Sequence, residues 1–226
     1  MGEPGTRTPR GRYRAQVQEE IKQHAWGQIA TAGASALSLN AIAKQMGMSG
    51  PALYRYFANR DQLITELVKD AYRSLADTFA ARTEAGTDLE GLAQALRRWA
   101  LDDPQRYFLV YGTPVPGYEA PEDTTRIAAE IMAHLLDACA AGQPPATPRP
   151  LDSHLAENRA WAGEHPAPSS VLRRALTFWT RLHGVLSLEL AGHFTGMGFD
   201  PAELYIDEVR ALGASGADAA LLAEEK

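Results

Sequence analysis

The sequence predicts an all-α protein with about nine helices in two domains, and three observations indicate it. Apolar residues recur at steps of three and four through most of the 226 residues. No stretch alternates between apolar and polar residues for long enough to predict a β-strand. Capping side chains and first-turn prolines precede most of the apolar runs. The composition, 45% hydrophobic and 22% charged, is that of a globular protein and argues against a disordered one.

The N-terminal part of the chain holds the first helices. Residues 1–11 lack periodicity and are rich in Gly, Pro, Thr and Arg, so we expect a flexible basic arm. A helix over residues 13–32 is predicted by apolar residues that step by four: Val17, Ile21, Ala25 and Ile29. Ser38 is expected to cap a helix over residues 38–46, which Gly47 closes. Its buried side holds Leu39, Ile42, Ala43 and Met46.

A turn and a short third helix follow. The turn reads Gly-Met-Ser-Gly-Pro, and the helix is predicted over residues 50–57. On a helical wheel, Leu53 and Phe57 share one side, which we expect to dock on the preceding helices. A helix this short is not stable alone, so docking is required and the opposite side would stay free.

The rest of the chain holds the longer helices. Asn59 and Gln62 form a capping-box pair at the start of a helix over residues 60–82. Further helices are predicted over 88–101, 104–111, 123–140, 170–195 and 201–213, with a weak one within 152–168. Their start signals are Thr87 with Glu90, Asp103 with Pro104, and Asp200 with Pro201 and Glu203. A three-helix domain would therefore cover residues 12–59 and a larger helical domain residues 60–226.

Charge is distributed unevenly along the chain. Residues 1–60 carry eight Lys or Arg against three acidic residues, which leaves +5. The remaining residues carry 14 against 25, which leaves −11 and gives the net charge of −6. Such asymmetry indicates a basic module on an acidic body, as expected when only one end of the chain approaches a polyanion.

The free side of the short helix presents polar groups: the guanidinium of Arg55 and the hydroxyls of Tyr54 and Tyr56. A helix, a glycine-containing turn and a short second helix are typical of a helix-turn-helix, whose second helix enters the DNA major groove. Lys44 lies on the first helix of the pair. Four arm arginines could follow the minor groove or the phosphates: Arg7, Arg10, Arg12 and Arg14. The alternative is an ordinary amphipathic surface.

The stretch LSLNAIAKQMGMSGPALYRYFANRDQLITEL, residues 37–67, resembles the DNA-binding segment of tetracycline-repressor-like (TetR) transcriptional regulators. The resemblance is carried by Ile42-Ala43, Gly47-Met48-Ser49, Pro51, Leu53-Tyr54-Arg55-Tyr56-Phe57 and Asn59-Arg60-Asp61-Gln62-Leu63. It implies that the following residues contact DNA: Ser38, Asn40, Ser49, Pro51, Tyr54, Arg55, Tyr56 and Arg60. Arg60 replaces the usual lysine, which keeps the charge and changes the donor geometry.

The resemblance also implies a ligand-responsive regulator, most simply a repressor, that binds a palindromic operator on double-stranded DNA as a homodimer. The order of long helices after the motif agrees with an effector-binding and dimerisation domain. The segment Phe178-Trp179-Thr180-Arg181-Leu182-His183-Gly184 looks like the Trp-His-Gly signature of one subgroup. Dimerisation is predicted through residues 170–195 and 201–213, where apolar residues exceed what one helix side needs: Leu172, Leu176, Trp179, Leu182, Leu186 and Leu190.

A pocket for a largely apolar small-molecule effector is predicted in the acidic domain. Aromatic and Met residues recur on the inward faces of four helices, and the predicted lining is Trp99, Tyr107, Tyr111, Met132, Trp179 and His183. The same residues could instead form solid core.

Features that could indicate an enzyme are weak. Two Glu-x-x-x-His pairs, Glu130 with His134 and Glu189 with His193, share helix faces, but they lack the spacing of helical carboxylate-bridged metal sites. Phosphate-binding loops, nucleophile elbows and paired-cysteine zinc motifs are missing from the sequence. We therefore expect no catalytic site, no metal and no cofactor. The alternative function is a helical small-molecule-binding protein or enzyme that only borrows the helix-turn-helix motif.

The sequence also indicates the compartment. The single cysteine, Cys139, stands in an apolar helical run, which favours a packing role in a reducing environment. The chain has neither an apolar run long enough for a membrane helix nor the apolar segment of a signal peptide. We expect a cytoplasmic protein without membrane contact.

Overall fold

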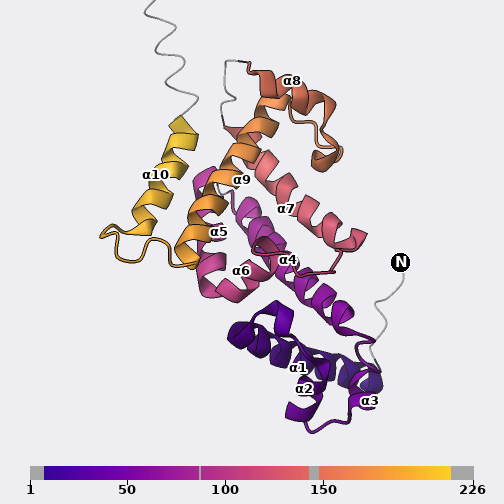
Figure 1. The fold of residues 1–226 in the computed structure, drawn as a ribbon. Helices are drawn as coiled ribbons and strands as arrows, with labels where there is room; N and C mark the ends of the chain where they lie inside the picture. The colour runs from indigo at the N-terminus through magenta and orange to yellow at the C-terminus, as the bar shows by residue number, and fades with distance from the viewer. Residues whose placement is uncertain (1–7, 87, 143–147, 215–226) are drawn as a thin grey trace, which may run out of the picture. The chain divides into compact units, whose positions relative to one another are not determined.

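The structure is a computed structural model that describes residues 8–86, 88–142 and 148–214. Within these residues it contains ten α-helices, two 3-10 turns and no strand, which confirms the predicted all-α class (Figure 1). The chain forms two compact units, and the long helix α4 (Arg60–Glu84) contributes residues to both. None of the described helices is long and apolar enough to cross a membrane.

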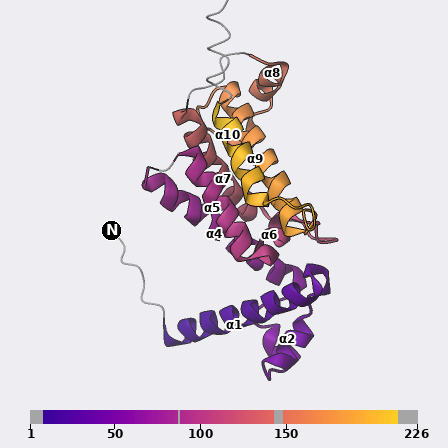
Figure 2. The same ribbon diagram turned by 90° about the vertical axis from the view of Figure 1, so that its left-hand side faces the viewer.

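The first unit contains Met1–Ala71 together with Gln105–Pro121. Its helical elements are α1 (Pro9–Ala32), η1 (Ala34–Ala36), α2 (Leu39–Gln45), α3 (Gly50–Leu53), the start of α4 and α6 (Pro104–Tyr111). In Figure 2, α1 runs past α2, with which it makes contact. The core of this unit is formed by side chains from α1, α2, α3, the segment between α3 and α4, and the start of α4: Ile21, Ala25, Ile42, Leu53, Phe57 and Leu63.

Helix α1 begins at Pro9, four residues before the predicted start at residue 13. The Thr8 hydroxyl accepts a hydrogen bond from the Gly11 amide at 3.2 Å, and proline occupies the first helical turn. This N-cap and first-turn proline explain the earlier start, and the prediction missed them. Residues 9–11 of the predicted arm are therefore helical, and residues 1–7 lie outside the described part.

Two of the predicted caps are present as hydrogen bonds. The Ser38 hydroxyl accepts from the Ala41 amide at 3.3 Å at the start of α2. The Asn59 side chain accepts from the Gln62 amide at 2.8 Å, and the Gln62 side chain accepts from the Ala58 amide at 2.6 Å. The two bonds satisfy the Gln62 amide, in the first turn of α4, and the Ala58 amide just before the helix.

The second unit contains Tyr72–Pro104 together with Glu122–Lys226. Besides the end of α4 it holds α5 (Leu89–Asp102), α7 (Glu122–Ala141), α8 (Pro150–Glu157), η2 (Ala160–Ala162), α9 (Ser169–Leu190) and α10 (Pro201–Ala214). Helix α9 is central, because it contacts α5, α7, α8 and α10. Figures 1 and 2 both show α10 lying beside α9. The core includes Leu96, Leu135, Leu172, Phe178, Leu182 and Leu186.

Several predicted helix ends were wrong. Helix α9 ends at Leu190 rather than at residue 195, because Gly192, Gly196 and Gly198 adopt positive φ angles that an α-helix cannot contain. Helix α5 is capped by Asp88, whose side chain accepts from the Gly91 amide at 3.0 Å. The predicted cap Thr87 lies outside the described residues. The weak helix predicted within 152–168 is α8 followed by η2.

Candidate nucleic-acid interface

The turn between α2 and α3 is built around Gly47. This residue has a φ angle of 65°, which glycine adopts without steric cost. The Met48 amide donates to the Ala43 carbonyl at 2.9 Å, so the end of α2 is satisfied by the turn itself. Helices α2 and α3 are in contact, which is the arrangement of a helix-turn-helix.

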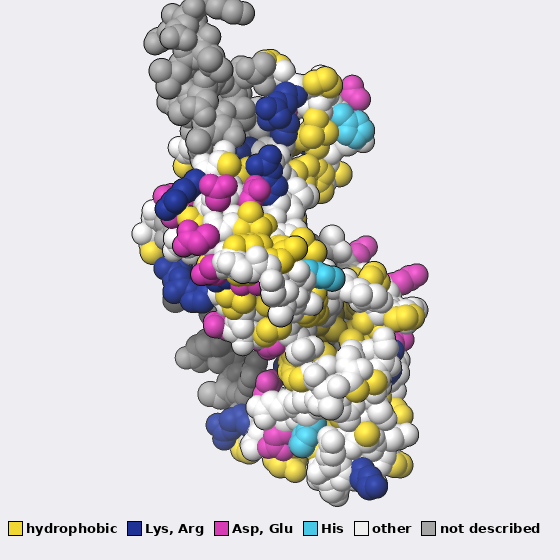
Figure 3. Space-filling model, turned by 60° about the vertical axis from the view of Figure 1, so that its left-hand side comes forward, with side chains coloured by type: hydrophobic (Ala, Val, Ile, Leu, Met, Phe, Trp, Pro, Cys, Tyr) yellow, Lys and Arg dark blue, Asp and Glu magenta, His cyan; other side chains and the backbone are white. Residues whose placement is uncertain are grey.

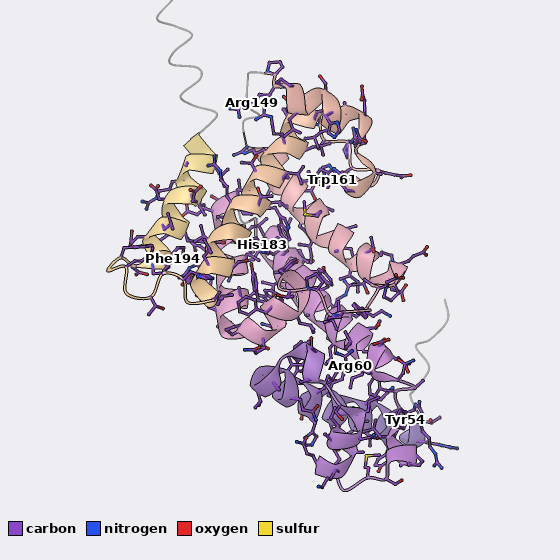
Figure 4. All side chains as sticks on the ribbon, in the orientation of Figure 1. Tyr54, Arg60, Arg149, Trp161, His183 and Phe194 are labelled. Atoms are coloured by element: carbon purple, nitrogen blue, oxygen red, sulfur yellow. The ribbon has the colours of Figure 1, made fainter. Side chains whose placement is uncertain are left out.

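Helix α3 presents one face outward and buries the other, as the helical wheel predicted. Leu53 is fully buried and Phe57 is 1% exposed, whereas Tyr54 is 45% exposed. Pro51 and Arg55 are also exposed, and Tyr56 is half-buried. Figure 4 labels Tyr54 at the edge of the first unit. Regular α-helix stops at Leu53, earlier than the predicted residue 57, and a hydrogen-bonded turn continues through Tyr56.

The start of α2 lies next to the start of α3. Asn40 and Lys44 are exposed on α2, while Ser38 is half-buried and its hydroxyl caps the helix. A Cβ atom placed on Gly50 would lie 3.6 Å from Oδ1 of Asn40, so the small residue at position 50 leaves room for this amide. Ser49 is exposed directly before α3. The structure thus brings together side chains that the sequence placed in separate helices.

Two of the predicted cationic DNA contacts are also tied to the protein. Arg60 Nη2 donates to the carbonyls of Ala34 at 2.9 Å and Ser35 at 3.3 Å. Arg14 Nη2 donates to the Arg55 carbonyl at 2.8 Å, and its guanidinium lies 5.2 Å from the ring centroid of Tyr56. These ties were missed, because no local pattern links a side chain to a carbonyl 26 or 41 residues away.

The remaining arm arginines are Arg7, Arg10 and Arg12. Arg10 and Arg12 are exposed on the first turns of α1, and Arg7 lies outside the described residues.

The predicted effector residues fall into the two units. Trp99, Met132, Trp179 and His183 come from α5, α7 and α9 of the second unit, three helices that contact one another. The rings of Trp179 and His183 lie 4.2 Å apart between centroids, and Trp99 Nε1 donates to the Ser74 hydroxyl at 3.1 Å. Tyr107 and Tyr111 belong to α6 in the first unit, with their ring centroids 5.5 Å apart.

Burial lowers the pKa of His183 to about 4. Its ring, labelled in Figure 4, is therefore neutral at pH 7 and can donate from one nitrogen and accept at the other. A neutral imidazole beside an indole is suited to orient the polar end of an apolar molecule and would not supply a charge.

The second unit contains a pocket of about 330 Å³ at one end of α5, α7, α9 and α10. Its lining is Asp88, Leu89, Glu90, Ala138, Ala141, Gly142, Arg174, Val209 and Arg210. Among the described residues that line this pocket, none is one of the six predicted effector residues.

The two Glu-x-x-x-His glutamates form ion pairs instead. Glu130 accepts from Arg73 at 2.5 and 3.1 Å, and this hydrogen bond lowers the pKa of the carboxyl. Glu189 accepts from Arg97 at 2.5 Å. Among the described residues, His, Cys, Asp and Glu form no cluster of three or more that could hold a metal ion. Both carboxylates are thus already neutralised by arginine.

Cys139 is fully buried, and burial raises the pKa of its thiol to about 12. The thiol is protonated at pH 7 and packs as a small apolar side chain. This confirms the predicted packing role.

A glycine-turned helix pair with an exposed Tyr and Arg face, set in a basic N-terminal segment, defines a helix-turn-helix DNA-binding protein. Comparison with known families makes this specific. Residues 22–67 match the model of bacterial regulatory proteins of the tetR family. Residues 89–212 match the tetracyclin repressor-like C-terminal domain. The chain belongs to the TetR family of transcriptional regulators, which confirms the predicted resemblance; the Trp-His-Gly subgroup stays a prediction.

Curated relatives carry the same assignment. The HTH-type transcriptional regulators Rv1816 of Mycobacterium tuberculosis (strain H37Rv) and Mb1846 of Mycobacterium bovis are each 36% identical over 215 residues. In both cases the match covers 88% of this chain and 92% of the relative.

Solved structures share the fold. The crystal structure of the protein SCO4313 is 69% identical, has a TM-score of 0.85 and covers 91% of this chain and 98% of that chain. A protein of unknown function from Rhodococcus sp. RHA1 is 21% identical with a TM-score of 0.65, covers 89% of this chain and 95% of its own length, and shows the fold alone.

Proposed function

We propose that this chain is a ligand-responsive repressor that binds a palindromic operator as a dimer and is released by a small molecule. Residues 12–59 would bind DNA with help from the arm, and residues 60–226 would bind the effector and dimerise. The observation that carries the DNA-binding role is the outward face of α3, where Pro51, Tyr54 and Arg55 are exposed while Leu53 and Phe57 anchor the helix.

Direct base readout is assigned to Arg55, because arginine pairs bidentately with guanine in the major groove. The other proposed contacts position the protein on the backbone: Ser38, Asn40, Lys44, Ser49, Pro51, Tyr54, Tyr56 and Arg60. The basic balance of the first sixty residues supports this division, because phosphate contacts provide most of the affinity that does not depend on sequence. A cytoplasmic location is proposed together with DNA as the partner.

Dimerisation is proposed through α9 and α10. Leu172, Leu182 and Leu186 are buried within the chain itself and so belong to its own core. Exposed apolar side chains occur instead near the connection of the two helices, where Leu188 is 45%, Met197 64% and Phe199 43% exposed. Figure 3 shows hydrophobic side chains gathered on this face. Dimers of helix-turn-helix proteins bind half-sites one turn of DNA apart, about 34–36 Å, which is the spacing proposed for this chain.

The effector is proposed to be a largely apolar molecule, neutral or cationic, that binds within the second unit, where Trp99, Met132, Trp179 and His183 lie. The neutral ring of His183 supports an uncharged polar contact. Helix α4 contributes residues to both units, so a shift of α4 on binding would change the separation of the two recognition helices. The effector must bind the released state more tightly, because equal affinity for both states shifts nothing.

The test begins with selection of duplexes from a random DNA pool by the full chain. A thermal-shift screen of apolar compounds follows, and each stabilising compound is then added to the protein on the selected duplex. We expect enrichment of a palindrome and at least one compound that weakens binding about tenfold or more, a coupling of ~1.4 kcal/mol. Enrichment without any such compound would remove the effector half of the proposal, and no enrichment would remove the whole.

A further inference from the structure

We call α3 and the turn after it, residues 50–57, the recognition segment. The exposed end of this segment is contacted by a side chain from another helix. Regular α3 contains only Gly50–Leu53, and the turn after it is closed by single backbone bonds. The Arg55 amide donates to Ala52 at 3.4 Å, the Tyr56 amide to Leu53 at 2.8 Å and the Phe57 amide to Leu53 at 3.3 Å. The last carbonyls of a helix need partners from outside it, and so short a segment has little cooperativity of its own.

Arg14 supplies such a partner. Its Nη2 donates to the Arg55 carbonyl at 2.8 Å, and its guanidinium lies 5.2 Å from the centroid of the Tyr56 ring. A cation at this end of a helical turn also meets the negative end of the backbone dipoles. One guanidinium therefore holds a backbone group and an aromatic ring of consecutive residues.

The position of Arg14 makes this tie rigid on one side. Arg14 lies on α1, whose next buried residues, Val17 and Ile21, fix the helix to the core. On the other side, Leu53 and Phe57 anchor the inner face of the recognition segment. The inner anchors leave Tyr54 and Arg55 on the outer edge, and Arg14 contacts this edge at the Arg55 carbonyl and the Tyr56 ring.

We propose that Arg14 is a positioning residue for sequence discrimination: it holds the α3 end, and with it Arg55 and Tyr56, in the orientation that reads DNA. This rests on the proposed operator binding. A guanidinium has about five N–H donors, so Arg14 can also meet a phosphate. The positioning role predicts a loss of discrimination, whereas a phosphate contact alone lowers affinity for every sequence equally.

The experiment compares the full chain with Arg14→Ala, Arg14→Lys and the matched control Arg12→Ala, an exposed arginine on the same helix. The probes are a duplex selected from a random pool by the wild-type chain and a scrambled duplex of the same composition. Hydrogen exchange of the amides of Arg55, Tyr56 and Phe57 is measured on the DNA-free protein.

For Arg14→Ala we expect the exchange rate of these amides to rise about fivefold, which corresponds to the free energy of one net hydrogen bond. The affinity ratio between the two duplexes should fall about tenfold, the loss of one base contact. Arg14→Lys keeps a donor group and the positive charge over the ring, so it should recover part of the amide protection and part of the affinity ratio. Arg12→Ala should lower the affinity for both duplexes equally. The ratio of the two affinities and the exchange rate of the amides should not change.

Equal weakening of both duplexes by Arg14→Ala, with unchanged exchange, would overturn the proposal. If Arg14→Ala unfolds the first unit, Arg14→Met decides, because methionine keeps an unbranched side chain and has neither the donors nor the charge. A folded methionine variant with the wild-type affinity ratio and wild-type exchange at residues 55–57 would also overturn the proposal. Failure of the wild-type chain to select any duplex would instead remove the proposed operator binding, so the two failures are distinguishable.

Discussion

Arg60 forms hydrogen bonds within the helix-turn-helix unit and is also proposed to contact DNA. Arg60 uses Nη2 for the carbonyls of Ala34 and Ser35, at 2.9 and 3.3 Å, which joins the start of α4 to the η1 turn before α2. Its Nη1 lies 3.8 Å from Oδ1 of the exposed Asp61, and the proposed phosphate contact would use this side of the guanidinium. The ammonium of a lysine, a compact point charge, does not reproduce this planar fork.

Arg60→Lys therefore separates the two roles. We expect the variant to keep the salt dependence of DNA binding, because the charge is retained, and to lose about 1 kcal/mol of unfolding free energy with the tie to η1. Arg60→Ala should lose the tie and also reduce the salt slope by about one. Urea unfolding and a salt titration of DNA affinity measure the two effects, and an unchanged slope in Arg60→Ala would show that Arg60 makes no phosphate contact.

His183 predicts a pH dependence of stability. Its pKa falls from 6.5 in the unfolded chain to about 4 in the folded one, so the unfolded state binds the extra proton. Titration of His183 leaves the free energy of unfolding unchanged above pH 6.5. As the pH falls from 6.5 toward 4, it lowers this free energy by about 1.4 kcal/mol per pH unit.

His183→Gln, which keeps a polar side chain without a proton to gain, should unfold with a weaker dependence on pH between 6.5 and 4.5. The measurement is urea unfolding of both proteins at several pH values in this window. Identical slopes would contradict a buried, neutral His183.

At the scale of elements, ion pairs fix the helices of the second unit. Arg173 on α9 donates from Nε to Asp152 Oδ1 at 2.6 Å and from Nη2 to Oδ2 at 3.4 Å, and the two side chains are only 7% and 13% exposed. The Arg173 hydrogen bond lowers the pKa of Asp152, whose carboxylate also accepts from the Arg149 amide. This pair joins α8 to the central helix.

Arg173→Met should destabilise the chain by about 2 kcal/mol, because it removes the guanidinium that pairs with the partly buried Asp152 carboxylate. The double variant Arg173→Met, Asp152→Leu should recover most of this loss, since an apolar pair of similar size needs no desolvation of charge. Thermal unfolding of the three proteins gives the comparison. A single variant as stable as wild type would mean that α8 does not depend on this pair.

Elements were predictable where their signals are local. Ser38 and Asn59 predict helix starts, because each caps a backbone amide only three residues further along the chain. Both caps are present as hydrogen bonds. Ends were less predictable: the wheel gave the buried side of α3, but it could not show that regular helix stops at Leu53. Contacts such as Arg14 with the Arg55 carbonyl join residues 41 apart and depend on packing that no sequence window contains.

For the whole molecule, the proposed dimerisation would bury the exposed apolar patch at the α9–α10 connection. Leu188→Glu should weaken the dimer strongly, because a charge would be buried in the interface. The matched control is Leu151→Glu on α8, where the leucine is 47% exposed compared with 45% for Leu188. Light scattering at micromolar concentration should show a smaller mass for Leu188→Glu only. Equal masses for all three proteins would place the interface elsewhere.

Nuclease footprinting on DNA adjacent to the chain's own gene tests the central claim most directly. We predict protection of two half-sites whose centres lie about 10 bp apart or a multiple of this, in a palindrome. Protection should be lost in the Tyr54→Ala, Arg55→Ala double variant, whose substitutions lie on the exposed face and leave the buried anchors Leu53 and Phe57 in place. Undiminished protection by a folded double variant would contradict recognition through α3, and absence of any protected or selected DNA would contradict operator binding.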